Sequence, residues 1–137
     1  MTVDTEVEFN EDSSASINFS TFDIDGDVLT SNLTVCDTND GNITATLVGT
    51  TIDFDSEADY NGSACFDLVV SDETDNTTTT IDVTVNPVND APVFTSTSPT
   101  SFLASEGYLY TASATDVDFT GLTYAIEEGA TEGIELV

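Results

Sequence analysis

The sequence predicts an all-β protein built as a Greek-key β-sandwich. Apolar and polar side chains alternate with period two in several short segments, of which residues 64–70 and 77–85 are the clearest. Segments rich in Asp, Asn, Gly, Ser and Thr separate them at intervals of roughly ten residues, the spacing expected of a sandwich of short strands. Apolar stripes with helical period are absent from the sequence.

Residues 1–88 form the first predicted domain. Its expected strands cover residues 5–9, 15–19, 29–35, 43–48, 51–54, 64–70 and 77–85. The tripeptide Asn39-Asp40-Gly41 predicts a hairpin turn between the third and fourth of these strands, because Asp-Gly favours a two-residue turn.

Residues 89–137 are predicted to be the N-terminal part of a second, similar domain. Strands are expected to begin at Val93 and to cover residues 109–114 and 122–126. Asp116-Val117-Asp118 repeats the layout of Asp23-Ile24-Asp25, which indicates an internal repeat. Three or four strands with open edges are marginally stable alone. The sequence is therefore expected to come from a longer array, or else another chain supplies the missing strands.

The composition restricts the partners of this chain. It has 27 Asp and Glu residues but no Lys, Arg or His, which gives a formal net charge of −27. Nucleic acid is excluded as a partner because no side chain can neutralise a phosphate, and anionic membrane surfaces are excluded for the same reason. No apolar run is long enough for membrane insertion. Carboxylate repulsion opposes the compact state unless cations are bound.

The segment joining the two predicted domains, residues 86–92, is the most informative stretch. It contains Pro87 and Pro92, which stiffen the chain, and places Asn89 and Asp90 between them. It resembles the linker of cadherin-type repeats, which reads Asp-x-Asn-Asp-Asn-x-Pro-x-Phe. Aligned on Pro92 and Phe94, three of the four ligand positions keep an oxygen-bearing side chain. The resemblance is closest to the Ig-like, cadherin-like tandem repeats of large bacterial surface adhesins of the RTX type.

The resemblance implies that calcium is the cofactor and identifies candidate ligands. Asp55-Ser56-Glu57 stands where cadherins have Asp-Arg-Glu, and both Asp-x-Asp turns match a cadherin motif. The ligands implied for the junction between the domains are Glu11, Asp55, Glu57, Asn86, Asn89, Asp90, Asp116 and Asp118. Those implied for half of an upstream junction are Asp23, Asp25 and Asp72. Oxygen donors of this kind are the ligands that Ca²⁺ prefers.

Cys36 and Cys65 are the only cysteines. Their positions in the alternating pattern place both side chains off the predicted core, which is compatible with a disulfide between neighbouring strands. An extracellular protein is expected to form it. Closing a loop of about 30 residues stabilises the folded state by roughly 3.6 kcal/mol in the chain-entropy model.

These observations predict a calcium-rigidified extender or adhesion module at the bacterial cell surface, whose partners are neighbouring repeats or copies of itself. An enzyme is not expected, since the chain lacks His, Lys and Arg and offers only carboxylate chemistry. One alternative is a carbohydrate-binding module, for which Tyr108 and Tyr110 are the candidate contacts with a glycan. Another is a filament subunit in which strand exchange between chains completes residues 91–137.

Overall fold

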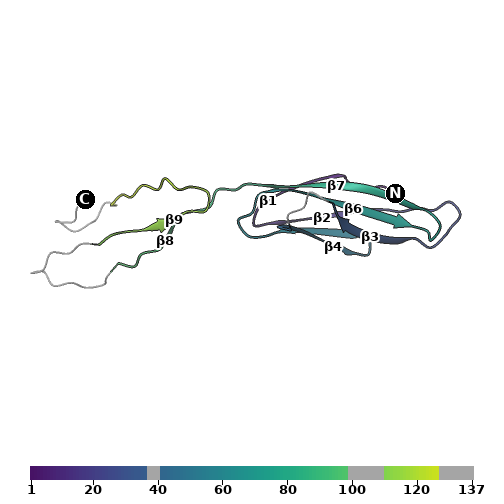
Figure 1. Ribbon diagram of the computed structural model, residues 1–137, viewed down its shortest axis with the longest axis horizontal. Helices are drawn as coiled ribbons and strands as arrows, with labels where there is room; N and C mark the ends of the chain where they lie inside the picture. The colour runs from purple at the N-terminus through teal and green to yellow at the C-terminus, as the bar shows by residue number, and fades with distance from the viewer. Residues whose placement is uncertain (37–40, 99–109, 127–137) are drawn as a thin grey trace, which may run out of the picture. The chain divides into compact units, whose positions relative to one another are not determined.

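The computed structural model describes residues 1–36, 41–98 and 110–126 (Figure 1). The chain divides into two compact units, Met1–Val88 and Asn89–Val137, which we call unit 1 and unit 2. All regular secondary structure in the described residues is β-strand. None of these residues forms a helix of the length and hydropathy needed to cross a membrane.

Unit 1 is a sandwich of two sheets, which confirms the predicted fold class (Figure 1). One sheet has the strand order β1-β7-β6-β3 and the other has the order β2-β5-β4. The strands are β1 (Glu6–Asn10), β2 (Ser14–Asn18), β3 (Thr30–Val35), β4 (Ile43–Val48), β5 (Thr51–Ser56), β6 (Gly62–Ser71) and β7 (Asn76–Asn86). Each lies within two residues of its predicted position at either end.

The first and last strands of unit 1 run parallel to each other. β1 pairs with β7 in the register Glu6↔Asp82 to Asn10↔Asn86, whereas the other pairings within the two sheets are antiparallel. Before β1, Thr2 forms an isolated antiparallel bridge with Ser20. The chain therefore contacts the segment that follows β2 at Thr2 and joins the four-stranded sheet from Glu6 onward.

The predicted hairpin between the third and fourth strands is wrong. β3 pairs with β6 and β4 pairs with β5, so the connection between β3 and β4 crosses from one sheet to the other. Residues 39 and 40 lie outside the described residues, but the pairing of the flanking strands decides the topology. A turn signal indicates a change of direction and does not identify the partner of the next strand.

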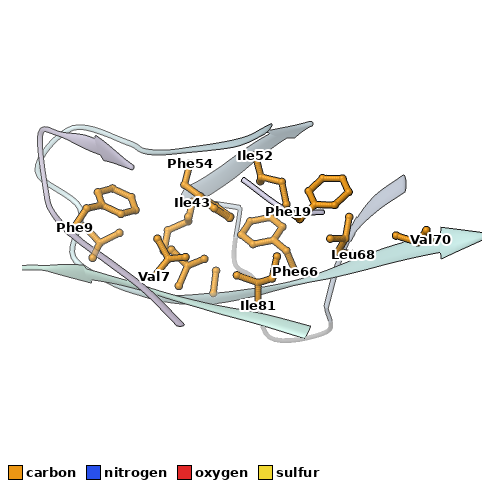
Figure 2. Packing of buried hydrophobic residues seen from close by; sticks show 13 residues of the cluster. Val7, Phe9, Phe19, Ile43, Ile52, Phe54, Phe66, Leu68, Val70 and Ile81 are labelled. Atoms are coloured by element: carbon orange, nitrogen blue, oxygen red, sulfur yellow. The ribbon is translucent and has the colours of Figure 1, made fainter. Parts of the chain in front are cut away.

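The core of unit 1 lies between the two sheets and is made of alternate side chains of their strands (Figure 2). Phe54 and Phe66 are fully buried and pack with their ring centroids 5.7 Å apart, joining one sheet to the other. The buried apolar residues are Val7, Phe9, Phe19, Ile43, Ile52, Phe54, Ala64, Phe66, Leu68, Val70, Ile81, Val83 and Val85. Strand alternation thus predicts the inward positions of β6 and β7 correctly.

A disulfide joins Cys36, which directly follows β3, to Cys65 in β6. The two residues extend the β3–β6 register by one pair, and the amide of Cys36 donates a hydrogen bond of 3.1 Å to the carbonyl oxygen of Cys65. Their Cα atoms are 5.4 Å apart, which is within the range usual for disulfides. The bridge fastens edge strand β3 to the sheet where the chain departs for β4.

Unit 2 contains one short antiparallel pair among its described residues, β8 (Val93–Phe94) with β9 (Ala114–Thr115). The strand predicted for residues 109–114 is largely wrong: residues 110–113 are irregular, and residue 109 lies outside the described part. The strand predicted for residues 122–126 is also wrong, because this segment is irregular throughout. It pairs with no strand among the described residues, and its apolar side chains Tyr124 and Ile126 are exposed.

Burial predicts which isoleucines stabilise unit 1. Ile81 has no exposed surface, so Ile81→Ala should lower the free energy of unfolding by about 2–5 kcal/mol, through lost apolar burial and the cavity left behind. Ile24 is 86% exposed in the loop after β2, and Ile24→Ala should change that free energy by less than about 0.5 kcal/mol. Urea unfolding followed by circular dichroism measures both. Equal effects of the two substitutions would contradict the assigned core.

Candidate functional site

The acidic loops of unit 1 lie at its two ends. The strand directions bring together the β1–β2 turn (residues 11–13), the β5–β6 loop (residues 57–61) and the residues that follow β7, and we call this the β1–β2 end. The opposite end, which we call the β6–β7 end, holds the β2–β3 loop (residues 19–29) and the β6–β7 turn (residues 72–75).

Glu11 is the buried polar residue of the β1–β2 end, with 4% of its surface exposed. Its amide donates a hydrogen bond of 2.9 Å to the carbonyl oxygen of Asn86, and its Oε1 accepts a hydrogen bond of 2.5 Å from the amide of Val88. A buried carboxylate is costly unless it is paired or hydrogen-bonded. Because the chain contains no cationic side chain, the available partners are hydrogen-bond donors, such as amides and hydroxyls, and bound cations.

Asp12 and Asp59 form a second feature of this end. Both have left-handed backbones, with φ of 58° and 57°, which Asp tolerates better than most residues. Asp12 Oδ1 accepts a hydrogen bond of 3.2 Å from the amide of Asp59, and oxygens of the two carboxylates lie within 4.8 Å of each other. With no intervening cation, two negative charges at this separation repel each other.

Sequence reasoning missed Asp12 and Asp59 as candidate ligands. Each lies in a segment rich in turn-forming residues, and their 47-residue separation hides the fact that they meet. A signal was nevertheless available, since the β1–β2 turn and the β5–β6 loop fall at the same end of any sandwich in which β2 pairs antiparallel with β5.

Three predicted ligands belong to the same end without converging on one point. Asp55 is exposed in β5, opposite Ser14 and Thr44. Glu57 is exposed just after β5, where its amide donates to the carbonyl oxygen of Asn42. Asn86 ends β7 and accepts the Glu11 amide through its backbone oxygen.

At the β6–β7 end, the predicted ligands Asp23 and Asp72 both organise their own turns. Asp23 Oδ1 accepts the amides of Asp25, Gly26 and Asp27 at 2.8, 2.8 and 3.2 Å. Asp72 Oδ1 accepts the amides of Thr74 and Asp75 at 2.8 and 2.7 Å. Side-chain to backbone bonds of this kind are the usual reason why Asp occurs in turns.

The two turns share a hollow of about 120 Å³, lined by Asp23, Asp72 and Asp75 together with the apolar Phe22 and Leu29. The predicted ligand Asp25 does not line it and is exposed. Asp23 and Asp72 therefore line one hollow, and Asp25 lies outside it.

Unit 2 repeats this turn and joins it to the start of the unit. Asp116 Oδ1 accepts the amides of Asp118 and Phe119 at 3.0 and 2.9 Å, as Asp23 does in unit 1. Asp118 Oδ2 accepts the amide of Asp90 at 2.6 Å, and Asn89 Nδ2 donates to the carbonyl oxygen of Asp90 at 2.6 Å. Four predicted ligands of unit 2 thus lie in one hydrogen-bonded group: Asn89, Asp90, Asp116 and Asp118.

The side chains gathered at these places offer carboxylate and amide oxygens. Such oxygens bind hard divalent cations, and Ca²⁺ accepts the irregular arrangements that turns and loops provide. Tyr110, one of the two candidate glycan contacts, is half-buried, with its hydroxyl 2.6 Å from the Oγ of Ser96. The other, Tyr108, lies outside the described residues.

The model of a known family, the bacterial Ig domain, matches residues 1–86. The chain belongs to the bacterial Ig domain family. The match extends over nearly all of unit 1 and agrees with its sandwich topology. No curated protein matches the chain. Bacterial Ig domains are structural, non-catalytic modules typically found in surface or extracellular proteins, and the Cys36–Cys65 disulfide is consistent with that location.

Lowering the pH should destabilise the β6–β7 turn, because it protonates the Asp72 carboxylate that accepts the turn amides. The amides of Asp75 and Thr74 stabilise its charged form and hold its pKa below the ordinary value of 3.8. A carboxyl group whose pKa is lower in the folded state than in the unfolded state stabilises the fold when the pH is above its unfolded-state pKa. This stabilisation is lost as the pH falls through its folded-state pKa. Asp72→Asn should therefore be less stable than the wild type near neutral pH, and the difference should close below pH 3.8.

Thermal melts across this pH range measure the effect. Asp82→Asn in β7 is the charge-matched control, because it removes one negative charge from an exposed strand position and leaves the charged acceptor of the turn amides, Asp72, in place. A difference between wild type and Asp72→Asn that stays constant as the pH falls would contradict this role of Asp72.

Proposed function

We propose that this bacterial Ig domain is a calcium-binding spacer of a cell-surface or adhesion protein, in which calcium bound at the domain ends removes carboxylate repulsion and stiffens the chain. The observation that carries the proposal is the β1–β2 end of unit 1. There a buried Glu11 and the close pair Asp12 and Asp59 are concentrated in a chain without a single cationic side chain.

A further observation supports calcium over a purely solubilising role for the charge. In the Asp-x-Asp turns of both units, Oδ1 of the first Asp, Asp23 or Asp116, accepts the amides two and three positions later. In each, the first Asp engages one carboxylate oxygen in its turn, which fixes the orientation of the group while its second oxygen remains a potential ligand. Solubility requires charge on the surface but does not require this repeated, oriented placement.

The finer assignment follows from the motifs at and around the linker. Residues 86–92, the Asp55-Ser56-Glu57 segment and the two Asp-x-Asp turns resemble the ligand motifs of cadherin-like repeats in bacterial adhesins. We place this chain among such repeats and assign the calcium ligands to the predicted set, with Asp12 and Asp59 added. Its partners are then neighbouring repeats or copies of itself, and its location is the cell surface.

A thermal melt in millimolar calcium, compared with excess chelator and with magnesium at constant ionic strength, tests the proposal. Binding to the folded state alone stabilises it by RT ln(1 + [L]/Kd), which is about 2.7 kcal/mol at 100 times Kd. The midpoint should therefore rise in calcium and much less in magnesium. An unchanged midpoint would contradict the proposal.

A charge-matched pair of variants locates the site. Asp12→Asn with Asp59→Asn removes two charges from the β1–β2 end, whereas Asp53→Asn with Asp82→Asn removes two from exposed strand positions. The first pair should reduce the calcium-dependent shift, and the control pair should leave it close to that of the wild type. Equal shifts in the two double variants would remove the β1–β2 end from the proposed site.

A further inference from the structure

Two strand edges and an apolar groove share one side of unit 1, which we call the β3–β4 side (Figure 1). β3 ends the four-stranded sheet and β4 ends the three-stranded sheet, and neither pairs on its outer edge with another strand among the described residues. The groove between them has a volume of about 290 Å³. Leu33 and Val35 of β3 and Ala45 of β4 line it, above the buried ring of Phe66.

The strands of this side carry no charge. Residues 28–36 and 41–52, which include the whole of β3 and β4, contain no Asp or Glu, although 20% of the chain is acidic. Asp37 and Asp40, in the connection between the two strands, lie outside the described residues.

The other surfaces of unit 1 carry carboxylates. On the opposite side, β1 presents the exposed Glu6 and Glu8, and the outer faces of the two sheets present the exposed Asp53 and Asp82. The acidic loops occupy both ends of the unit. A second copy of the chain therefore meets carboxylate repulsion on all of these surfaces, and meets least of it on the β3–β4 side.

The two edges also lack the usual protection against pairing. Proteins commonly protect an exposed strand edge with charged side chains or proline, because its free N–H and C=O groups can pair with another chain. β1 has such charges, whereas β3 and β4 have neither charge nor proline. They instead expose apolar side chains, Val35 with 59% and Val48 with 65% of its surface accessible.

We propose that two copies of this chain associate side by side through the β3–β4 side, with β3 of one copy pairing antiparallel with β3 of the other. We assign the contact to β3 because its exposed Val35 also lines the groove. A two-fold interface uses the same patch on both copies. This pairing joins two four-stranded sheets edge to edge, places Leu33 and Val35 of the two copies beside each other, and keeps the acidic surfaces of the copies apart.

This inference goes beyond the proposed calcium sites, which lie at the ends of the unit. It assigns a surface to one class of partner, copies of the same chain, and places spacers beside one another. None of the proposed calcium ligands belongs to residues 28–36 or 41–52, so the contact does not depend on bound calcium.

Sedimentation velocity of the full chain in chelator, over a range of protein concentrations, tests the association. We expect a reversible monomer–dimer equilibrium that strengthens with salt, because the rest of each copy is strongly negative. Raising NaCl from about 0.01 M to about 0.1 M shortens the Debye length from about 30 Å to about 10 Å, which screens this repulsion. A protein that stays monomeric up to about 1 mM at the higher salt concentration would overturn the proposal.

An isosteric pair of variants locates the contact. Asn32→Asp adds a negative charge in the middle of β3, where two-fold pairing brings it close to its copy. Asn18→Asp adds the same charge to β2, an edge strand on the opposite side, and keeps an acceptor for the hydroxyl of Thr51. Asn32→Asp should raise the dimer dissociation constant roughly two- to fivefold more than Asn18→Asp does, because like charges meet across the paired strands. Equal effects would overturn the assignment to β3.

Hydrogen exchange tests the strand pairing independently. Amide exchange in β3 should slow as the protein concentration rises, because the outer edge gains hydrogen-bond partners, whereas exchange in β2 should stay the same. Unchanged exchange in β3 of a dimeric protein would overturn the pairing.

The dimer and the proposed calcium binding fail separately. A dimer that forms in chelator, in a protein whose calcium melt shows no shift, would refute only the calcium sites. A calcium-dependent shift in a strictly monomeric protein would refute only the dimer.

Discussion

No cationic side chain offsets the negative charge of the carboxylates in this protein. The chain carries 27 acidic residues and no Lys, Arg or His, so repulsion is opposed by packing, by hydrogen bonds and by ions from solution. In unit 1 the core is apolar, and most acidic side chains lie on exposed strand faces or in the loops at the two ends of the sandwich. Among the described residues of unit 1, Glu11 is the buried acidic side chain, and the backbone amide of Val88 donates a hydrogen bond to its carboxylate.

The same constraint links the sandwich to its proposed role. Strands that alternate apolar and polar residues build the core, and the connections between them fall at the two ends of the unit, where Asp residues cap turns through their carboxylates. These caps concentrate oriented oxygens at the ends of the unit, where the proposed calcium sites lie. A single arrangement of strands therefore builds the apolar core and presents the proposed calcium sites.

The limits of sequence reasoning follow from what alternation encodes. The period-two pattern locates β6 and β7 and their inward residues Phe66 and Val83, because burial of one face selects it. It does not encode pairing: the Asp-Gly signal after β3 precedes a crossover, and residues 122–126 alternate in sequence without pairing with a strand in the described part of the chain. Asp12 and Asp59 escaped notice because they meet only through the β2–β5 register. The linker and Asp-x-Asp motifs were visible because each lies within a few consecutive residues.

The central claim is that the carboxylates form specific calcium sites and do more than attract a diffuse cloud of cations. Calorimetric titration of the full chain with calcium, at constant ionic strength and repeated with magnesium, tests it most directly. The account predicts a saturable isotherm of definite stoichiometry, with dissociation constants of about 0.1–1 mM as in extracellular calcium modules, and weaker binding of magnesium. A featureless, non-saturating response that is the same for both ions would contradict it, because it would show that the charge only condenses counterions.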